Sequence, residues 1–180
     1  MTKFIAFLRA INVGGHRVKM DHLRSLFQEL EFTNIETFIT SGNVIFDSFS
    51  QDVKALEKQI ENHLYKMLGY EVATFLRTTK EVIAISQYQP FSDFELTEHM
   101  ALNVAFLSDP LEQEAQLALT KFKTEIDDFY SQGREVYWLC HKKQSESTFS
   151  NALFERRLKV KATFRGINTV RKLAAKYLDC

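Results

Sequence analysis

The spacing of hydrophobic residues predicts alternating strands and helices in the first half of the chain. Short apolar runs bounded by turn residues are typical of buried strands, and apolar positions three and four residues apart are typical of helices. The predicted elements are a strand at 4–8, a helix with apolar positions at Met20, Leu23, Leu26, Phe27 and Leu30, strands at 35–40 and 44–46, a helix with apolar positions at Val53, Leu56, Ile60, Leu64 and Met67, and a strand at 71–77. Ser50 is the predicted cap of the second helix. This order is that of a ferredoxin-like unit.

The second half repeats this pattern less regularly. A short helix begins at Thr79 and ends before Pro90, and an acidic, irregular stretch follows. The later elements are a strand at 102–107, a helix that starts at Asp109-Pro110, strands at 126–130 and 135–140, a helix at 151–158, a short strand at 160–164 and a final helix with Asn168 as its predicted cap. A four-residue similarity between Arg9-Ala10-Ile11-Asn12 and Arg165-Gly166-Ile167-Asn168 does not establish an internal repeat.

These elements predict an α+β fold of two ferredoxin-like (βαββαβ) subdomains packed into one compact body. The first subdomain covers residues 1–90, residues 91–100 form an acidic linker, and residues 101–180 form the second, less regular subdomain with its basic C-terminal helix. A chain of 180 residues suits one domain or two small ones. It is 45% hydrophobic and contains 16 phenylalanines, which is enough to form a sizeable core.

A net charge of zero conceals an uneven distribution of charge along the chain. Residues 91–130 contain nine acids and two lysines, whereas residues 141–180 contain ten cations and three acids. The first 24 residues carry five cations and a single acid. Two interpretations stay open: the charges are solvated faces that compensate each other, or the two basic ends meet in one anion-attracting surface.

Other features of composition favour a cytoplasmic protein without a membrane partner. No apolar run approaches the ~20 residues needed to span a bilayer, and the first apolar run, Phe4–Leu8, is too short for a signal peptide. Cys140 and Cys180 are too few for a disulfide framework. The five histidines form no ligand pattern, so we predict no metal site, and the sequence indicates no particular cofactor.

The candidate functional segment is the loop from Arg9 to Lys19, which contains Gly14-Gly15 and three cations between a strand and a helix. In a ferredoxin-like sheet, the end of the first strand and the turn between the second and third strands lie at the same edge. The loop is therefore expected beside Ser41-Gly42-Asn43, with a helix N-terminus pointing at the same place. Unpaired N–H groups, cations and amides together favour a phosphate or carboxylate. The predicted ligand-binding residues are Arg9, Asn12, Gly14, Gly15, Lys19, Ser41 and Asn43.

Three functions stay open for this loop. The first is a binding module for a phosphorylated or other anionic ligand, either a nucleotide or a nucleic acid backbone. The second is a small enzyme of phosphoryl or acyl transfer, although no convincing nucleophile or general base accompanies the loop. The third is a protein-interaction domain. The loop matches neither a P-loop nor a dinucleotide fingerprint, and the two glycines are also explained by a tight connection.

RNA binding on an open sheet is disfavoured by the pattern of the strands. Such domains carry aromatics on an otherwise polar sheet face. Here Phe4–Leu8 and Val44–Phe46 are apolar on both faces, so the sheet is expected to be covered on both sides and its aromatics to belong to the core.

Three segments resemble the bacterial family called domain of unknown function 1697 (DUF1697). They are Leu8–Gly15 followed by Val18-Lys19-Met20 and Leu23, Thr40–Phe46, and the late segment from Arg165 to Leu173. The resemblance covers the whole chain and implies a two-part α+β fold in a soluble bacterial protein, without an assigned activity. The family usually has Gly where this chain has Ala10, and commonly Trp where it has Ile167.

The late segment adds Arg165 and Asn168 to the predicted ligand-binding residues. Asn168 is a plausible cap of the last helix, which is the structural interpretation. The functional interpretation is a second anion-binding helix end that completes the first site if the two halves meet there.

Overall fold

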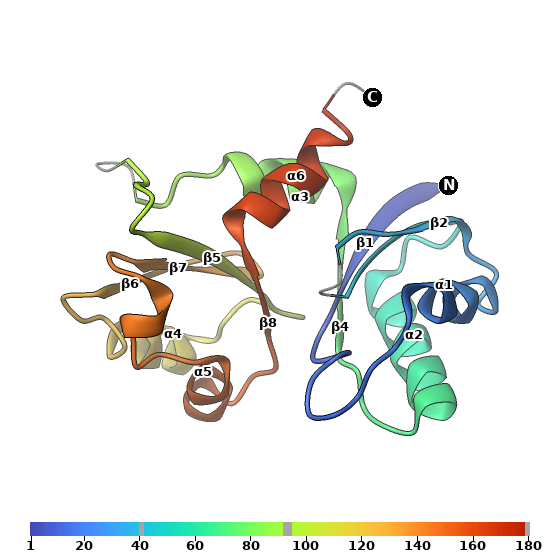
Figure 1. Ribbon diagram of the computed structural model, residues 1–180, viewed down its shortest axis with the longest axis horizontal. Coiled ribbons are helices and arrows are strands. Elements are labelled where there is room, and N and C mark those ends of the chain that lie inside the picture. The colour runs from blue at the N-terminus through green and yellow to red at the C-terminus, as the bar shows by residue number, and fades with distance from the viewer. Residues whose placement is uncertain (40–41, 92–94, 179–180) are drawn as a thin grey trace. The chain divides into compact units, whose positions relative to one another are not determined.

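The computed structural model describes residues 1–39, 42–91 and 95–178 (Figure 1). In chain order, its elements are β1 (Thr2–Leu8), α1 (Met20–Gln28), β2 (Thr33–Thr37), β3 (Asn43–Ser48), α2 (Val53–Leu68), β4 (Thr74–Thr78), α3 (Thr79–Gln87), β5 (Ala101–Phe106), α4 (Gln113–Thr120), β6 (Asp127–Gln132), β7 (Glu135–Cys140), a 3-10 turn η1 (Gln144–Glu146), α5 (Asn151–Leu158), β8 (Thr163–Gly166) and α6 (Ile167–Ala175).

The strands form two four-stranded antiparallel sheets. Their strand orders are β2-β3-β1-β4 and β6-β7-β5-β8, and each sheet belongs to a strand-helix-strand-strand-helix-strand unit. In each sheet the first and third strands of the unit are central, and the second and fourth are edges. This is the ferredoxin-like order, so the predicted α+β fold class is confirmed.

The chain divides into two structural units, each with one sheet. Unit 1 consists of Met1–Ala84 and Leu173–Cys180, and unit 2 of Ile85–Lys172. The sequence-based ranges 1–90 and 101–180 assign every strand to the same half. They differ from this division because residues 85–90 belong to unit 2 and the end of the chain belongs to unit 1, where Lys176 pairs with Glu36 and lies over the Phe38 ring.

The core of unit 1 lies between its sheet and the helices α1 and α2. Leu23, Leu26 and Phe27 of α1 and Leu56, Ile60 and Leu64 of α2 are buried against alternate residues of β1 and β3. The remaining residues of these strands are buried as well, since Phe4–Leu8 and Val44–Phe46 are all at most 1% exposed. Both faces of the two central strands are therefore covered, and the prediction that their aromatics are core residues is confirmed.

Three predicted helix starts were wrong. Asp52, not Ser50, caps α2, its carboxylate accepting a hydrogen bond from the Ala55 N–H at 3.0 Å. Asp109 lies in a bend, and α4 begins only at Gln113. The last helix begins at Ile167, directly after β8, which leaves Asn168 exposed inside its first turn rather than at its cap.

Glutamates occupy the outward N–H groups of the edge strand β4. Glu61 and Glu57 of α2 accept from Thr74 and Leu76 at 2.8 and 2.9 Å, and Glu81 of α3 accepts from Thr78 at 2.7 Å. In unit 2, Glu155 of α5 accepts in the same way from the N–H of Ala162, just before the edge strand β8, at 3.1 Å. Because an open edge invites pairing with another chain, these carboxylates protect the sheets from aggregation.

The fourth strands of the two units also carry equivalent arginines. Arg77 lies opposite Ile5, the fourth residue of β1, and Arg165 lies opposite Val104, the fourth residue of β5. Each guanidinium donates to the carbonyl of the preceding residue, at 2.8 and 2.9 Å, and each arginine is followed two positions later by the first residue of a helix. Arg165 is thus the counterpart of Arg77 and not of Arg9. The sequence similarity between residues 9–12 and 165–168 therefore reflects no structural equivalence.

Candidate anion-binding loop

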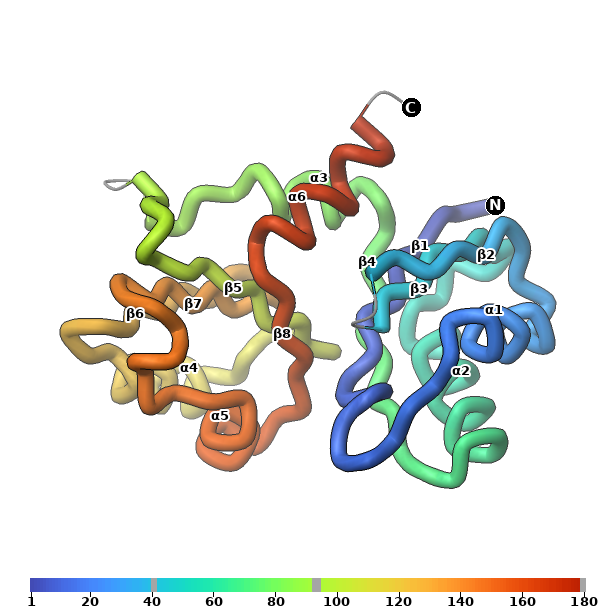
Figure 2. The backbone as a smooth tube through the Cα atoms, viewed as in Figure 1, coloured from blue at the N-terminus to red at the C-terminus, as the bar shows by residue number. Residues whose placement is uncertain are grey.

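Gly14 and Gly15 form a tight turn inside the loop between β1 and α1, which can be followed in Figure 2. The His16 N–H donates to the Val13 carbonyl at 3.3 Å, and the two glycines have φ of 68° and 87°. Positive φ at both central positions is the signature of a type I′ turn, which strongly favours glycine. Turn geometry therefore accounts for the glycine pair, while the space beside both residues stays open, with nothing within 4 Å of a built Cβ.

The two ends of the loop are held by contacts within unit 1. The Asn12 side-chain oxygen accepts a hydrogen bond from the Val18 N–H at 2.8 Å. Tyr70 donates its hydroxyl to the Ile11 carbonyl at 3.0 Å, and its ring stacks on His16 with 3.8 Å between centroids. Burial raises the pKa of Tyr70, so the phenol remains a hydrogen-bond donor at neutral pH. The predicted ligand residue Asn12 thus also closes the loop.

The loop meets the turn between β2 and β3, as the sheet topology predicts. The Leu8 N–H donates to the Gly42 carbonyl at 2.8 Å, and a Cβ at Gly42 would lie 2.7 Å from Cγ2 of Ile11. Asn43 is fully buried, and its amide donates to the Phe38 carbonyl at 2.9 Å. Ser41, another predicted ligand residue, lies outside the described residues.

The N-terminus of α1 lacks a capping side chain. Its N-cap residue is Lys19, which has no acceptor atom in its side chain and makes no capping hydrogen bond. By contrast, α2 is capped by Asp52 and α5 by Ser150. Lys19 and Arg17 are both exposed beside this helix end. Asp21 in the first turn is paired with Arg24. The helix end therefore presents N–H groups and two cations to solvent.

The remaining predicted residues lie in different settings. Arg9 is half-buried, and its N–H donates to the Ala73 carbonyl at 2.9 Å. Arg165 in unit 2 is 8% exposed and donates to the hydroxyl of Thr163, and burial lowers its pKa to about 10. Asn168 is exposed on the first turn of α6. That these two residues complete the loop site stays a prediction.

Ala10 adopts a left-handed conformation at the start of the loop, with φ of 55°. A residue with a Cβ is strained there, whereas glycine is not. This backbone geometry explains why glycine suits the position.

A family model for proteins of unknown function, DUF1697, matches residues 1–137. The chain belongs to the DUF1697 family. The match includes the Arg9–Lys19 loop and the β2–β3 turn, while the late segment from Arg165 to Leu173 lies outside the matched residues. None of the curated proteins matches the chain.

A solved structure extends the likeness of this DUF1697 protein to its whole length. The conserved bacterial protein SP0830 from Streptococcus pneumoniae is 22% identical, and the alignment covers 98% of each chain with a TM-score of 0.75. At this identity the likeness establishes the fold. It supports the two-unit α+β architecture beyond residue 137.

Ala10→Gly is expected to raise the free energy of unfolding by about 0.5–1 kcal/mol, because it relieves the left-handed strain. Urea denaturation of the two proteins measures this change. Ala84→Gly provides the matched control: Ala84 is exposed in α3, so the same substitution there should lower stability by about as much. Destabilisation by both substitutions would contradict the assigned strain.

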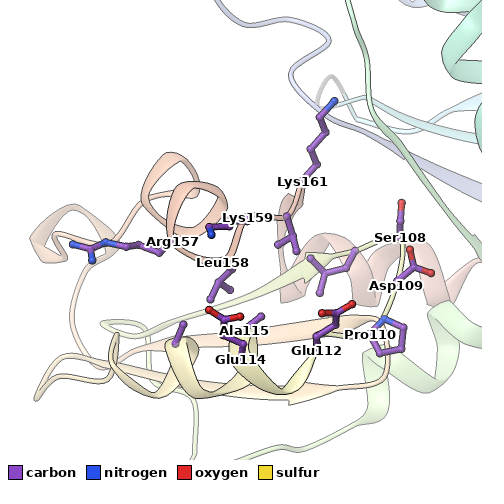
Figure 3. A pocket seen from close by; sticks show the side chains of 13 residues that line it. Ser108, Asp109, Pro110, Glu112, Glu114, Ala115, Arg157, Leu158, Lys159 and Lys161 are labelled. Atoms are coloured by element: carbon purple, nitrogen blue, oxygen red, sulfur yellow. The ribbon is translucent and has the colours of Figure 1, made fainter.

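Unit 2 contains a pocket of about 530 Å³ that the sequence did not indicate (Figure 3). Its acidic residues Asp109, Glu112 and Glu114 come from the start of α4 and the segment before it. Its basic residues Arg157, Lys159 and Lys161 come from the end of α5 and the segment after it. The pocket is thus lined by three acidic and three basic residues. The helix predicted to start at Asp109-Pro110 had included residues 109–112, which instead precede α4 and help to line this pocket.

Neither a metal-binding cluster nor a membrane-spanning helix is found among the residues described. In ranges 1–39, 42–91 and 95–178, no three His, Cys, Asp or Glu side chains are grouped so that they could hold a metal ion. None of the helices in the same ranges has the length and hydrophobicity required to cross a bilayer.

Proposed function

We propose that this protein binds a phosphorylated or otherwise anionic ligand at the N-terminus of α1, with Arg17 and Lys19 as its charged contacts. The observation that carries the proposal is the uncapped first turn of α1 beside two exposed cations. A phosphate or carboxylate oxygen would accept hydrogen bonds from the N–H groups of that turn, as a capping side chain does elsewhere.

A comparison within the molecule supports a preference for anions at this helix end. The helix α4 also lacks a capping hydrogen bond, but its N-cap is Glu112 and Glu114 lies in its first turn. Negative side chains there already complement the helix dipole and repel an anion. At α1 two of the three residues just before the helix, Arg17 and Lys19, are cations, and the one acid of the first turn is paired with Arg24.

We assign most of the other predicted ligand-binding residues to holding the loop in shape rather than to contacting the ligand. Gly14 and Gly15 turn the chain, and Asn12 closes the loop on Val18, which would hold Arg17 and Lys19 near the helix end. The buried Asn43 holds the neighbouring turn. Arg9 begins the loop and contributes a further positive charge.

Binding, rather than turnover, is the function we favour. Phosphoryl or acyl transfer requires a nucleophile or a general base at the reacting group. Residues 9–19 include no Ser, Thr, Cys, Asp or Glu, and the one histidine, His16, is stacked on the Tyr70 ring. The ligand class is a small phosphorylated metabolite or nucleotide, and a nucleic acid backbone offers the same phosphate chemistry. As the setting we propose the bacterial cytoplasm, which suits a chain with only two cysteines.

Lys19→Asp is expected to abolish anion binding while stabilising the protein by about 1 kcal/mol. The new carboxylate would cap α1 and repel an anion, and aspartate is among the best N-cap residues. Thermal unfolding with and without inorganic phosphate, AMP, tripolyphosphate, citrate and a short oligonucleotide measures both effects. The original protein should be stabilised by at least one of these anions, and the variant by none.

Lys58→Asp serves as the control, because it changes the net charge by the same two units as Lys19→Asp. Lys58 is exposed on the surface of α2 in the same unit, remote in sequence from the loop. This variant should keep the full ligand-induced shift. If no anion stabilises the original protein, or if Lys58→Asp and Lys19→Asp lose the shift equally, the proposed site is wrong.

A further inference from the structure

Unit 2 contains a second pocket, of about 640 Å³, whose lining differs in kind from that of the loop. Its walls come from β5, β7, β8, η1 and the start of α5, and they combine aromatic rings with amides and hydroxyls. The lining residues are Asn103, Trp138, Gln144, Ser145, Phe149, Ser150, Asn151 and Phe164. No charged side chain belongs to this described lining.

Asn103 is an unexpected residue at its position in the sheet. It lies on the central strand β5, on the face where Ala105 and Leu107 belong to the apolar core of unit 2. Its exposed fraction is only 8%, yet it lines the pocket. Burying an amide costs free energy unless its polar atoms find partners, and the opening of the pocket leaves those of Asn103 accessible to one.

The partners found in the protein leave this amide incompletely satisfied. Asn103 donates to the side-chain oxygen of Gln144 across 3.4 Å, which is a long hydrogen bond. Within the described ranges, we find no residue that donates to the Asn103 side-chain oxygen. Gly166 lies opposite Asn103 on β8 and has no side chain to cover that oxygen. An acceptor and a donor therefore remain available on the pocket side.

Aromatic rings surround this amide. Trp138 lies opposite Asn103 on β7, with its ring centroid 4.6 Å from that of Phe149, and Phe164 on β8 lies 6.3 Å from Trp138. The indole N–H of Trp138 donates to the buried Asp127 at 2.8 Å, which fixes the ring. Trp138 and Phe149 are only 2% and 8% exposed, so the ring that the pocket presents beside the Asn103 and Gln144 amides is that of the half-buried Phe164.

The combination of an aromatic ring with two amides indicates which class of ligand the pocket would bind. Fixed aromatic surface favours a planar ring, and an amide presents a donor and an acceptor side by side, which matches the edge of a nucleobase. The absence of charged groups from the described lining disfavours a ligand that is recognised by its charge. We propose that this pocket binds the base of a nucleoside, with the Asn103 and Gln144 amides contacting its edge and the Phe164 ring its face.

Trp138 makes the proposal directly testable because it is the only tryptophan of the chain. Its fluorescence would be titrated with adenosine, guanosine, cytidine and uridine, with ribose and benzyl alcohol as the sugar and generic-ring controls. We expect saturable quenching by at least one nucleoside and none by ribose. Free N-acetyltryptophanamide, measured in parallel, corrects for absorption and collisional quenching.

Two variants separate specific recognition from a generic apolar pocket. Asn103→Leu should weaken the nucleoside by about tenfold or more, because the base edge loses its partner. Gln144→Ala, at an exposed position, should weaken it several-fold and decides the question if Asn103→Leu does not fold. Lys19→Asp should leave the titration unchanged, so this result is independent of the anion site.

Three results would overturn the proposal. The first is the absence of saturable quenching with all four nucleosides up to their solubility. The second is equal quenching by benzyl alcohol, which would assign the pocket to apolar rings in general. The third is nucleoside binding that neither Asn103→Leu nor Gln144→Ala weakens.

Discussion

Gly42→Ala is expected to lower the free energy of unfolding by about 2–4 kcal/mol, because strain and crowding add at this position. Gly42 has φ of 79°, and an added Cβ would lie 2.7 Å from Cγ2 of Ile11 and 3.3 Å from Cβ of Leu8. Both neighbours are at most 2% exposed, so neither can move aside freely. Urea denaturation, followed by circular dichroism, measures the loss.

Gly14→Ala isolates the contribution of crowding. Gly14 has a similar φ of 68°, but nothing lies within 4 Å of its built Cβ. The alanine there should cost about 1–2 kcal/mol, from left-handed strain alone. Equal losses for the two variants would show that the contact between the loop and the β2–β3 turn is not tight.

Glu57→Leu is expected to destabilise the protein by about 2–3 kcal/mol. Glu57 is 4% exposed and accepts a hydrogen bond from the N–H of Leu76 on the edge strand β4. Leucine would leave this buried N–H without its acceptor, and an unsatisfied buried donor costs about 1–3 kcal/mol. Denaturation gives the stability change, and hydrogen exchange of the Leu76 amide shows whether its protection is lost.

Glu57→Gln is the matched variant, because the glutamine carbonyl can still accept from Leu76. It should retain most of the stability and most of the protection of that amide. Equal losses of stability with Gln and Leu would mean that the negative charge of Glu57, rather than its hydrogen bond to β4, stabilises the protein. Lys54, with its Nζ 3.9 Å from the Glu57 carboxylate, would then be the partner to test next.

Hydrophobic spacing predicted most elements because it reports burial, which decides where strands and helices form. The strand β7 and the helix α5 were predicted to the residue. Spacing could not select between neighbouring cap residues such as Ser50 and Asp52, since both side chains can accept a hydrogen bond. It also placed Met67 in the buried stripe of α2, whereas this residue is 45% exposed near the end of the helix.

The candidate loop was chosen from the sequence, but the contacts that hold it in place were not predicted. The glycines and cations of the loop can be read directly from the sequence, and the sheet topology predicts that the loop lies beside the β2–β3 turn. Tyr70, however, is 59 residues away from Ile11, the residue whose carbonyl it binds, and no local pattern marks that contact. The pocket around Asn103 was missed for the same reason, because its lining comes from five separate elements.

The contacts of Tyr70 and Asn12 have a consequence for how the loop meets a ligand. A loop of eleven residues normally loses much conformational entropy when it becomes ordered around a ligand. Here the type I′ turn, the Asn12 bond to Val18 and the Tyr70 bond to Ile11 remove that freedom when the chain folds. The loop is thus a preorganised surface, and a molecule that reaches it encounters its final shape.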